Sequence, residues 1–136
     1  MADKTFKLEI VSPAKVLFNG EVVSFSAPGV LGGFQVLYNH APLLAEVDTG
    51  EVKVLKTDGT EIFFAVSGGF VSVFDNNVIL LAECAERANE IDLERARIAR
   101  DNSRKKLAEK LSESELYEAH QALKRAINRI KIAEKR

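Results

Sequence analysis

The sequence predicts a β + α protein: an N-terminal antiparallel β-sandwich of about ten strands, followed by a C-terminal antiparallel two-helix hairpin. Apolar residues alternate or form short runs in the first part, as in strands, and recur every three or four positions in the second, as along a helix. The charge divides similarly. Residues 1–91 hold six Lys or Arg against twelve Asp or Glu, a net of −6, whereas residues 92–136 hold thirteen against eight, a net of +5. We therefore expect a sandwich domain over residues 1–88 and a mobile helical domain over residues 89–136.

The first part consists of short strand-like segments bounded by turn signals. The segment from Thr5 to Val11 alternates with period two, and similar segments follow as far as Glu83. We read Asn19-Gly20, Asp58-Gly59 and Gly68-Gly69 as turns or breaks between strands. Seven of the eight phenylalanines lie at or before residue 70, as a core between two facing sheets requires. The spacing of these signals gives the count of about ten strands.

The second part predicts two helices with identifiable starts. Asp92 suits the N-cap of the first, and Ser112 with Glu115 three residues later forms a capping box for the second. The first helix carries a thin apolar seam interrupted by polar residues, whereas the second carries a cleaner stripe from Leu116 to Ala133. The short link between them predicts a hairpin. Its few large aliphatic residues predict that it is marginal alone and docks on the sandwich, on a partner or around a ligand.

Nothing in the sequence nominates a catalytic residue or a metal site. Neither common phosphate-binding glycine loop is present, and His40 and His120 lie in different parts with no Cys/His cluster near them. We therefore expect a chain that is not an enzyme by itself. Cys84 is the single cysteine and lies in an apolar run, so we expect a buried, inert thiol.

Composition bears on the partners. A net charge of −1 gives no general attraction to nucleic acid, and we expect no nucleic-acid partner. No apolar run approaches the roughly 20 residues that span a bilayer, so we expect no direct membrane insertion. The N-terminal residues show neither an apolar signal segment nor a transit segment, which disfavours an imported organelle protein.

Two groups of residues could form binding surfaces. Leu31 and Phe34, in the stretch that also holds His40, offer an apolar contact if their loop projects from the rim of the sandwich. If the hairpin folds back over residues 85–92, several arginines converge near Glu86 and Asp92 and could bind triphosphate oxygens. The alternative for the arginines, a solvated basic face with local ion pairs, stays open.

Four short motifs, in this order and spacing, carry a family resemblance. They are Gly33–Leu43, Ser67–Phe70, Ala85–Ala88 and Ile91–Ala96. From about Phe6 to Glu134 the chain resembles the ε subunit of bacterial F-type ATP synthases, a central-stalk subunit equivalent to mitochondrial δ. The resemblance implies a non-catalytic rotor subunit that binds the γ subunit and the ring of c subunits and helps couple ion translocation to ATP synthesis. It also implies a peripheral location on the cytoplasmic face of the bacterial plasma membrane, within the F1 sector.

The resemblance implies two protein-contact surfaces. The family's hairpin can lie compact on the sandwich, or extend into the catalytic α/β head and obstruct ATP hydrolysis there by meeting an acidic segment of a β subunit. The rotor-contact loop would comprise Leu31, Phe34, His40, Ala41 and Pro42. The inhibitory basic face would comprise Arg100, Arg104, Lys105, Lys124, Arg125 and Arg129.

Some family members bind ATP on the compact hairpin, and the resemblance implies a matching set of contacts here. The set is Glu86, Ile91, Asp92, Arg95, Ala96, Arg125 and Arg129. Asn102 stands where those members have an arginine, and the loss of one guanidinium would weaken binding. We expect no required cofactor and a regulatory ATP, with or without magnesium. Two alternatives stay open: a chain that primarily senses ATP, and an unrelated β-sandwich binding domain with a helical tail.

Overall fold

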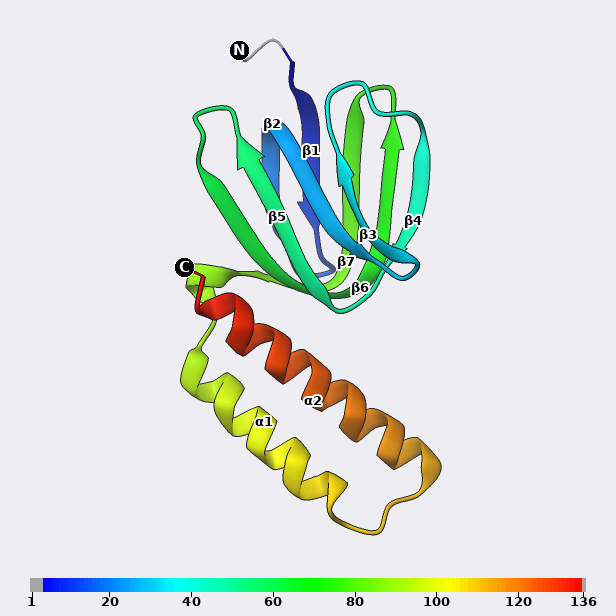
Figure 1. The fold of residues 1–136 in the computed structure, drawn as a ribbon, viewed down its shortest axis with the longest axis vertical. Coiled ribbons are helices and arrows are strands. Elements are labelled where there is room, and N and C mark those ends of the chain that lie inside the picture. The colour runs from blue at the N-terminus through cyan, green and yellow to red at the C-terminus, as the bar shows by residue number, and fades with distance from the viewer. Residues whose placement is uncertain (1–3, 136) are drawn as a thin grey trace.

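The computed structural model describes residues 4–135 and shows a β domain with a helical hairpin at one end (Figure 1). The strands are β1 (Phe6–Val11), β2 (Val16–Gly29), β3 (Gly32–Val36), β4 (Leu43–Val47), β5 (Gly50–Lys56), β6 (Glu61–Phe74) and β7 (Asn77–Arg87). A short 3₁₀ turn, η1 (Ala88–Glu90), leads into α1 (Leu93–Leu107) and α2 (Glu113–Ala133). The predicted fold class, a sandwich followed by a two-helix hairpin, is confirmed.

The described chain has seven strands rather than about ten, because two predicted breaks lie inside long strands. β2 and β6 each contain 14 residues. Asn19 and Gly20 do not form a turn, since they pair with Glu9 and Leu8 in the β1–β2 ladder. Gly68-Gly69 likewise lies within β6, which continues through it. A break between strands requires the ladder to end, and here the partner strands continue past both glycine-containing pairs.

The sheet closes into a flattened barrel that has two layers. Its strand order is β1-β7-β6-β4-β2-β3, β5 joins β2 to β6, and β1 also pairs with β2. β1 and β7 run parallel, whereas the other pairings described are antiparallel. Inward-facing residues fill the space between the layers, and the largest of them, Phe6, Phe25 and Phe64, are almost completely buried. The β domain therefore has a hydrophobic core of its own.

Gly69 allows β6 to bend between the layers. Its φ of +135° lies in a region that side chains avoid, and an added Cβ would lie 2.2 Å from the carbonyl oxygen of Leu81 in β7. Only glycine permits this approach of the two backbones. The bend separates the half of β6 that pairs with β5 from the half that pairs with β4.

Both predicted helix starts are confirmed. The Oδ1 of Asp92 accepts a hydrogen bond from the backbone N–H of Arg95 at 3.0 Å. The Ser112 hydroxyl accepts from the N–H of Glu115 at 3.3 Å, and the Glu115 carboxylate accepts from the N–H of Ser112 at 3.2 Å. Each cap needs only residues within one turn, so the local sequence determines it.

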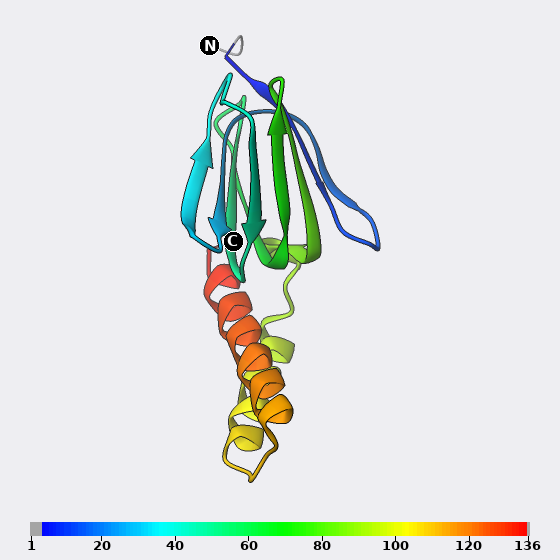
Figure 2. The ribbon, with the colours of Figure 1, turned by 90° about the vertical axis from the view of Figure 1, so that its right-hand side faces the viewer.

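The hairpin contacts the β domain chiefly through the C-terminal end of α2. A small apolar cluster separate from the sandwich core forms this contact: Ala65, Ala88, Ile91, Ile132 and Ala133, with Phe63 and Leu93 packed against it. The rest of the hairpin extends away from the sandwich, and the described N-terminal segment lies at the opposite end (Figure 2). The expectation that the hairpin docks on the sandwich is confirmed, although the apolar contact that holds it is limited.

Candidate functional site

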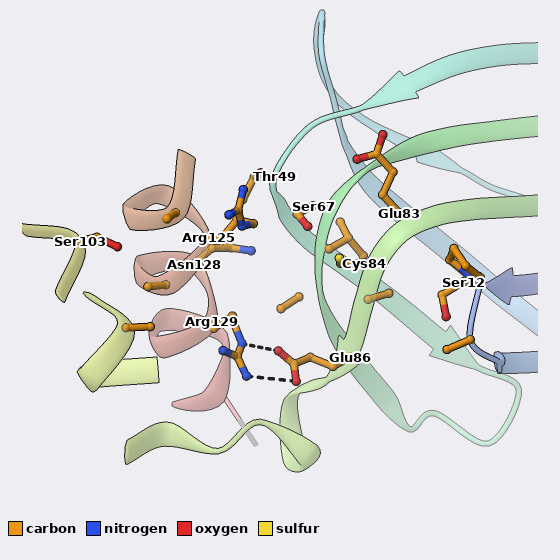
Figure 3. Close-up of a pocket in the computed structure, with 18 residues that line it drawn as sticks. Ser12, Thr49, Ser67, Glu83, Cys84, Glu86, Ser103, Arg125, Asn128 and Arg129 are labelled. Atoms are coloured by element: carbon orange, nitrogen blue, oxygen red, sulfur yellow. Dashed lines mark hydrogen bonds and ion pairs between the residues drawn. The ribbon is translucent and has the colours of Figure 1, made fainter. Parts of the chain in front are cut away.

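A cavity of about 590 Å³ lies between the hairpin end of the sandwich and the two helices (Figure 3). Its size falls in the range of small-molecule sites. Strand and loop residues form one wall and α2 most of the other. The polar and ionisable residues that line it are Ser12, Thr49, Ser67, Glu83, Cys84, Glu86, Ser103, Arg125, Asn128 and Arg129.

One bidentate ion pair crosses this cavity. Arg129, on α2, donates from Nε to the Oε1 of Glu86, at the end of β7, and from Nη2 to Oε2 at 3.4 Å (Figure 3). Both side chains are partly buried, with 27% and 32% of their surface exposed. The planar guanidinium matches the carboxylate, so Arg129 holds α2 against β7 in this conformation.

Arg125 lies one helical turn before Arg129 and points into the same cavity (Figure 3). Within residues 4–135 it forms no ion pair. It also lines a second hollow of about 420 Å³ between the helices, together with Asn102. Arg125 is therefore a cation available to an anionic ligand. Asn102, which the resemblance aligns with an arginine of the ATP-binding members, presents only an amide there.

The predicted nucleotide residues separate into two groups. Glu86, Arg125 and Arg129 meet at the cavity. Asp92 instead caps α1, while Ile91 is buried in the apolar cluster under α2 and Ala96 is buried. The predicted convergence of arginines does not include Arg95. That side chain is exposed in the first turn of α1 and is not part of the cavity lining.

The cavity also contains residues that sequence reasoning missed or misplaced. Cys84 was expected to be buried, but its side chain is exposed and lines the cavity (Figure 3). It continues the inward-facing positions Leu80 and Ala82 of β7, which are buried. At Cys84 the strand has passed the sandwich core, so its inner face meets the cavity instead. Glu83 adds a second carboxylate to the lining.

The predicted basic face does not form one continuous surface. Arg104 and Lys105 are exposed on α1, and Arg100 pairs with its neighbour Asp101 at 3.0 Å. Lys124 and Arg129, on α2, pair with carboxylates of the sandwich. In this conformation α1 presents its cations to solvent, while α2 directs part of its own toward the β domain.

The predicted rotor-contact residues lie at opposite ends of the sandwich and do not form one loop. Leu31 lies in the β2–β3 turn at the hairpin end, where Val30 N–H donates to the carbonyl of Glu46 at 2.9 Å. His40, Ala41 and Pro42 lie beyond β3, a strand of five residues or about 17 Å. At that far end Asn39 N–H donates to Asn76 Oδ1 at 2.8 Å. The prediction of a single loop overlooked the length of the strand between its two halves.

The sandwich also presents a broad apolar face that sequence reasoning did not find. Large side chains on the outer surface of β4, β6 and β7 are exposed: Leu44, Phe70, Phe74, Ile79 and Leu81. Phe70 pairs with Leu81 across β6 and β7, and Ser72 lies between Leu44 and Ile79. The signal was present in residues 78–82, an uninterrupted apolar run that places apolar residues on both faces of β7.

Two family models match consecutive parts of the chain. The ATP synthase delta/epsilon chain β-sandwich domain matches residues 5–88, and the delta/epsilon chain long α-helix domain matches residues 89–134. The chain belongs to the ATP synthase delta/epsilon family. It is a non-catalytic subunit of ATP synthase.

Similar curated proteins carry the same description. The ATP synthase epsilon chain of Syntrophomonas wolfei is 40% identical over 135 residues, 99% of this chain and 98% of that protein. The epsilon chain of Desulforamulus reducens is 43% identical over 131 residues, 96% of this chain and 98% of that protein.

Two solved structures share the fold of this family member. A chain of the Euglena gracilis mitochondrial ATP synthase, described as OSCP/F1/c-ring, superposes with a TM-score of 0.83 at 21% identity, covering 98% of this chain and 82% of that one. A chain of the Tetrahymena thermophila mitochondrial ATP synthase central stalk and c-ring gives a TM-score of 0.64 at 16% identity, covering 93% of this chain and 95% of that one.

Among residues 4–135, no helix is long and apolar enough to cross a membrane, and no cluster of three or more His, Cys, Asp or Glu could hold a metal ion.

Proposed function

We propose that this chain is a rotor subunit of a bacterial F-type ATP synthase, which couples ion translocation to ATP synthesis and restrains ATP hydrolysis through its hairpin. The observation that carries the proposal is the match of residues 5–134 to the two domains of the delta/epsilon family. Its partners are the γ subunit, the c-subunit ring and the α/β catalytic head. In this assembly the chain lies on the cytoplasmic face of the plasma membrane, within the F1 sector.

The sandwich is the anchoring part. Its outer face on β4, β6 and β7 groups five large exposed apolar side chains on neighbouring strands, and such a grouping is typical of a protein-binding surface. We assign this face to the stalk partner γ. The two turn regions, at Leu31 and at His40–Pro42, are separate contact points at opposite ends of the sandwich, so they serve different neighbours.

The hairpin is the regulatory part. It is joined to the sandwich by a small apolar cluster, so it can leave that position without exposing the core of the β domain. Residues 92–136 carry a net charge of +5 (thirteen basic against eight acidic residues), which directs the freed helices toward an acidic surface. On α1, Arg104 and Lys105 are already exposed and form no ion pair within the described residues. They are the first basic groups that an acidic segment of a β subunit would meet.

A full-length charge reversal tests the inhibitory role. Arg104→Glu combined with Lys105→Glu should raise the ATPase activity of the reconstituted complex, because both contacts to the acidic segment become repulsive. The matched control, Lys4→Glu at the far end of the sandwich, should leave activity unchanged. Deletion of residues 92–136 should raise ATPase activity at least as much while leaving assembly intact. Inhibition that persists in both the reversal and the deletion would reject the proposal.

The cavity has the volume and the cations for a regulatory ATP, which we propose as a ligand of the compact hairpin. Arg125 would bind phosphate oxygens directly. Arg129 would have to exchange the Glu86 carboxylate for phosphate, and the Asn102 amide supplies no positive charge. These features favour weak binding, in which ATP stabilises the compact state by population shift. Titration of the full chain with ATP should give a saturable signal that Arg125→Ala abolishes, and no saturable signal below millimolar ATP would reject ATP sensing.

A further inference from the structure

We propose that three carboxylates of the sandwich form an ionic latch that holds α2 in the compact position without nucleotide, by occupying cations that an acidic partner would otherwise bind. The latch consists of Asp48, Glu51 and Glu86 on the sandwich, Lys124 and Arg129 on α2, and Lys135 in the turn just after α2.

The three pairs run from the middle of α2 to the residues just after its end. Lys124 Nζ lies 3.1 Å from Asp48 Oδ1, in the β4–β5 turn. Arg129 pairs with Glu86 at the end of β7, and Lys135 pairs with Glu51 on β5. Two further contacts support the same register: Asn128 donates to the carbonyl of Gly50 at 3.0 Å, and the Lys135 ammonium lies 5.3 Å from the ring centroid of Phe63.

In all three pairs the sandwich supplies the acid and the helical part supplies the base. Every ion pair between the two parts of the described chain joins an acid of the sandwich to a base of α2 or of the turn that follows it. The remaining ion pairs in residues 4–135 stay within one part, as Lys53–Glu61 does in the sandwich. The opposite net charges of the two halves of the sequence therefore meet at one interface. That interface includes the surface of α2 that the family resemblance assigned to an acidic partner.

Weak pairs matter here because the apolar contact is small. Exposed ion pairs contribute little individually and are screened by salt. Besides the ion pairs, however, the described contacts of the hairpin with the sandwich are mainly one minor apolar cluster and the two contacts of Asn128 and Lys135, and a cavity of about 590 Å³ separates much of the hairpin from the sandwich. The equilibrium between docked and released hairpin is then close enough to balance for a few charges to shift it. We therefore infer that ionic strength controls release.

Two of the three latch pairs do not depend on a ligand in the cavity. Asp48, Glu51, Lys124 and Lys135 do not line the cavity, so a ligand there leaves two of the three pairs in place. Lys124 cannot pair with Asp48 and with an acidic partner at once. Binding of α2 to any such partner therefore begins with the opening of this contact. Only this last step depends on the proposed inhibitory function.

The test uses the full chain without nucleotide. Its single cysteine, Cys84, lines the cavity beneath the hairpin and reports release through its rate of modification by a bulky maleimide. Asp48→Lys and Lys124→Asp should each raise this rate roughly three- to tenfold at low salt, and the double swap should restore the original rate. The matched control is the swap of Lys53 and Glu61, a pair within the sandwich, which should leave the rate unchanged.

A salt titration of the unmodified sequence guards against variants that fail to fold. Raising sodium chloride from about 10 mM to about 500 mM shortens the screening length severalfold, so Cys84 modification and hydrogen exchange in α2 should both accelerate. Rates that do not respond to salt overturn the latch, as do single reversals without effect or a swap that fails to restore the rate. Since the measurement needs no ATP synthase complex, failure of the inhibitory proposal would leave its outcome unaffected.

Discussion

Replacing Ile132 with alanine should release the hairpin while leaving the sandwich folded. Ile132 has no exposed surface and is the large apolar side chain that α2 contributes to the cluster that joins it to the β domain. The sandwich core is a separate cluster that does not contain it. The substitution therefore removes apolar contact from the junction alone.

The expected magnitude follows from burial. Truncating a fully buried isoleucine to alanine costs about 2–5 kcal/mol, and the cost is higher where neighbours cannot fill the space. Three neighbours of Ile132 in the cluster are alanines, which are too short to extend into the gap. A loss of about 3 kcal/mol would lower the docking equilibrium constant by roughly a hundredfold.

Native-state hydrogen exchange measures this effect for each element. In Ile132→Ala, the amides of α1 and α2 should exchange much faster, while those of β5 and β6 keep their protection. The matched control is Ile98→Ala, at a side chain on α1 that is 53% exposed, which should change stability by less than about 0.5 kcal/mol. If the strands lose protection in parallel with the helices, or if both variants behave alike, this cluster is not what holds the hairpin.

Three further predictions concern caps, backbone and pH. Ser112→Ala removes the capping box and should lower the stability of α2 by about 1 kcal/mol, measured by circular dichroism on heating. Gly69→Ala should destabilise the sandwich by more than about 3 kcal/mol in urea, whereas Gly59→Ala, whose Cβ would meet nothing within 4 Å, should cost only about 1–2 kcal/mol for its positive φ. The N–H of Thr49 and the Lys124 ammonium lower the pKa of Asp48 below its ordinary value of 3.8. Only the Lys124 share of this lowering depends on docking, because Thr49 lies in the same turn as Asp48. That share stabilises the docked state at higher pH and is lost as the pH falls through the lowered pKa. NMR should therefore show α2 loosening below about pH 4, less steeply in Asp48→Asn.

Features that depend on a few adjacent residues could be predicted from the sequence. Asp92 and the pair Ser112–Glu115 were placed correctly because an N-cap involves only the first turn of its helix. The sandwich and hairpin followed from the change of hydrophobic period, since that period reflects which face of each element is buried. These signals act over one turn or one strand, and a single sequence displays them directly.

Features that depend on which strands are neighbours could not be predicted in this way. Asn19-Gly20 resembles a turn until its pairing with β1 is known, and Leu31 seems close to His40 until β3 is seen to run the length of the sandwich between them. Cys84 was misplaced for a similar reason. Its position in an apolar strand was clear, but the end of the opposing core, which exposes it, is a property of the whole barrel.

The opposite charges of the two halves acquire a different meaning once the fold is known. A basic arm was expected to seek an acidic partner, and the first acidic partner within its reach is the sandwich of the same chain. Any external partner that needs these cations binds only the fraction of molecules in which the hairpin is released, so its apparent affinity falls in proportion to that fraction. The isolated helices would therefore bind such a partner more tightly than the full chain does. By holding the helices, the sandwich both anchors the subunit and sets how readily its regulatory part becomes available.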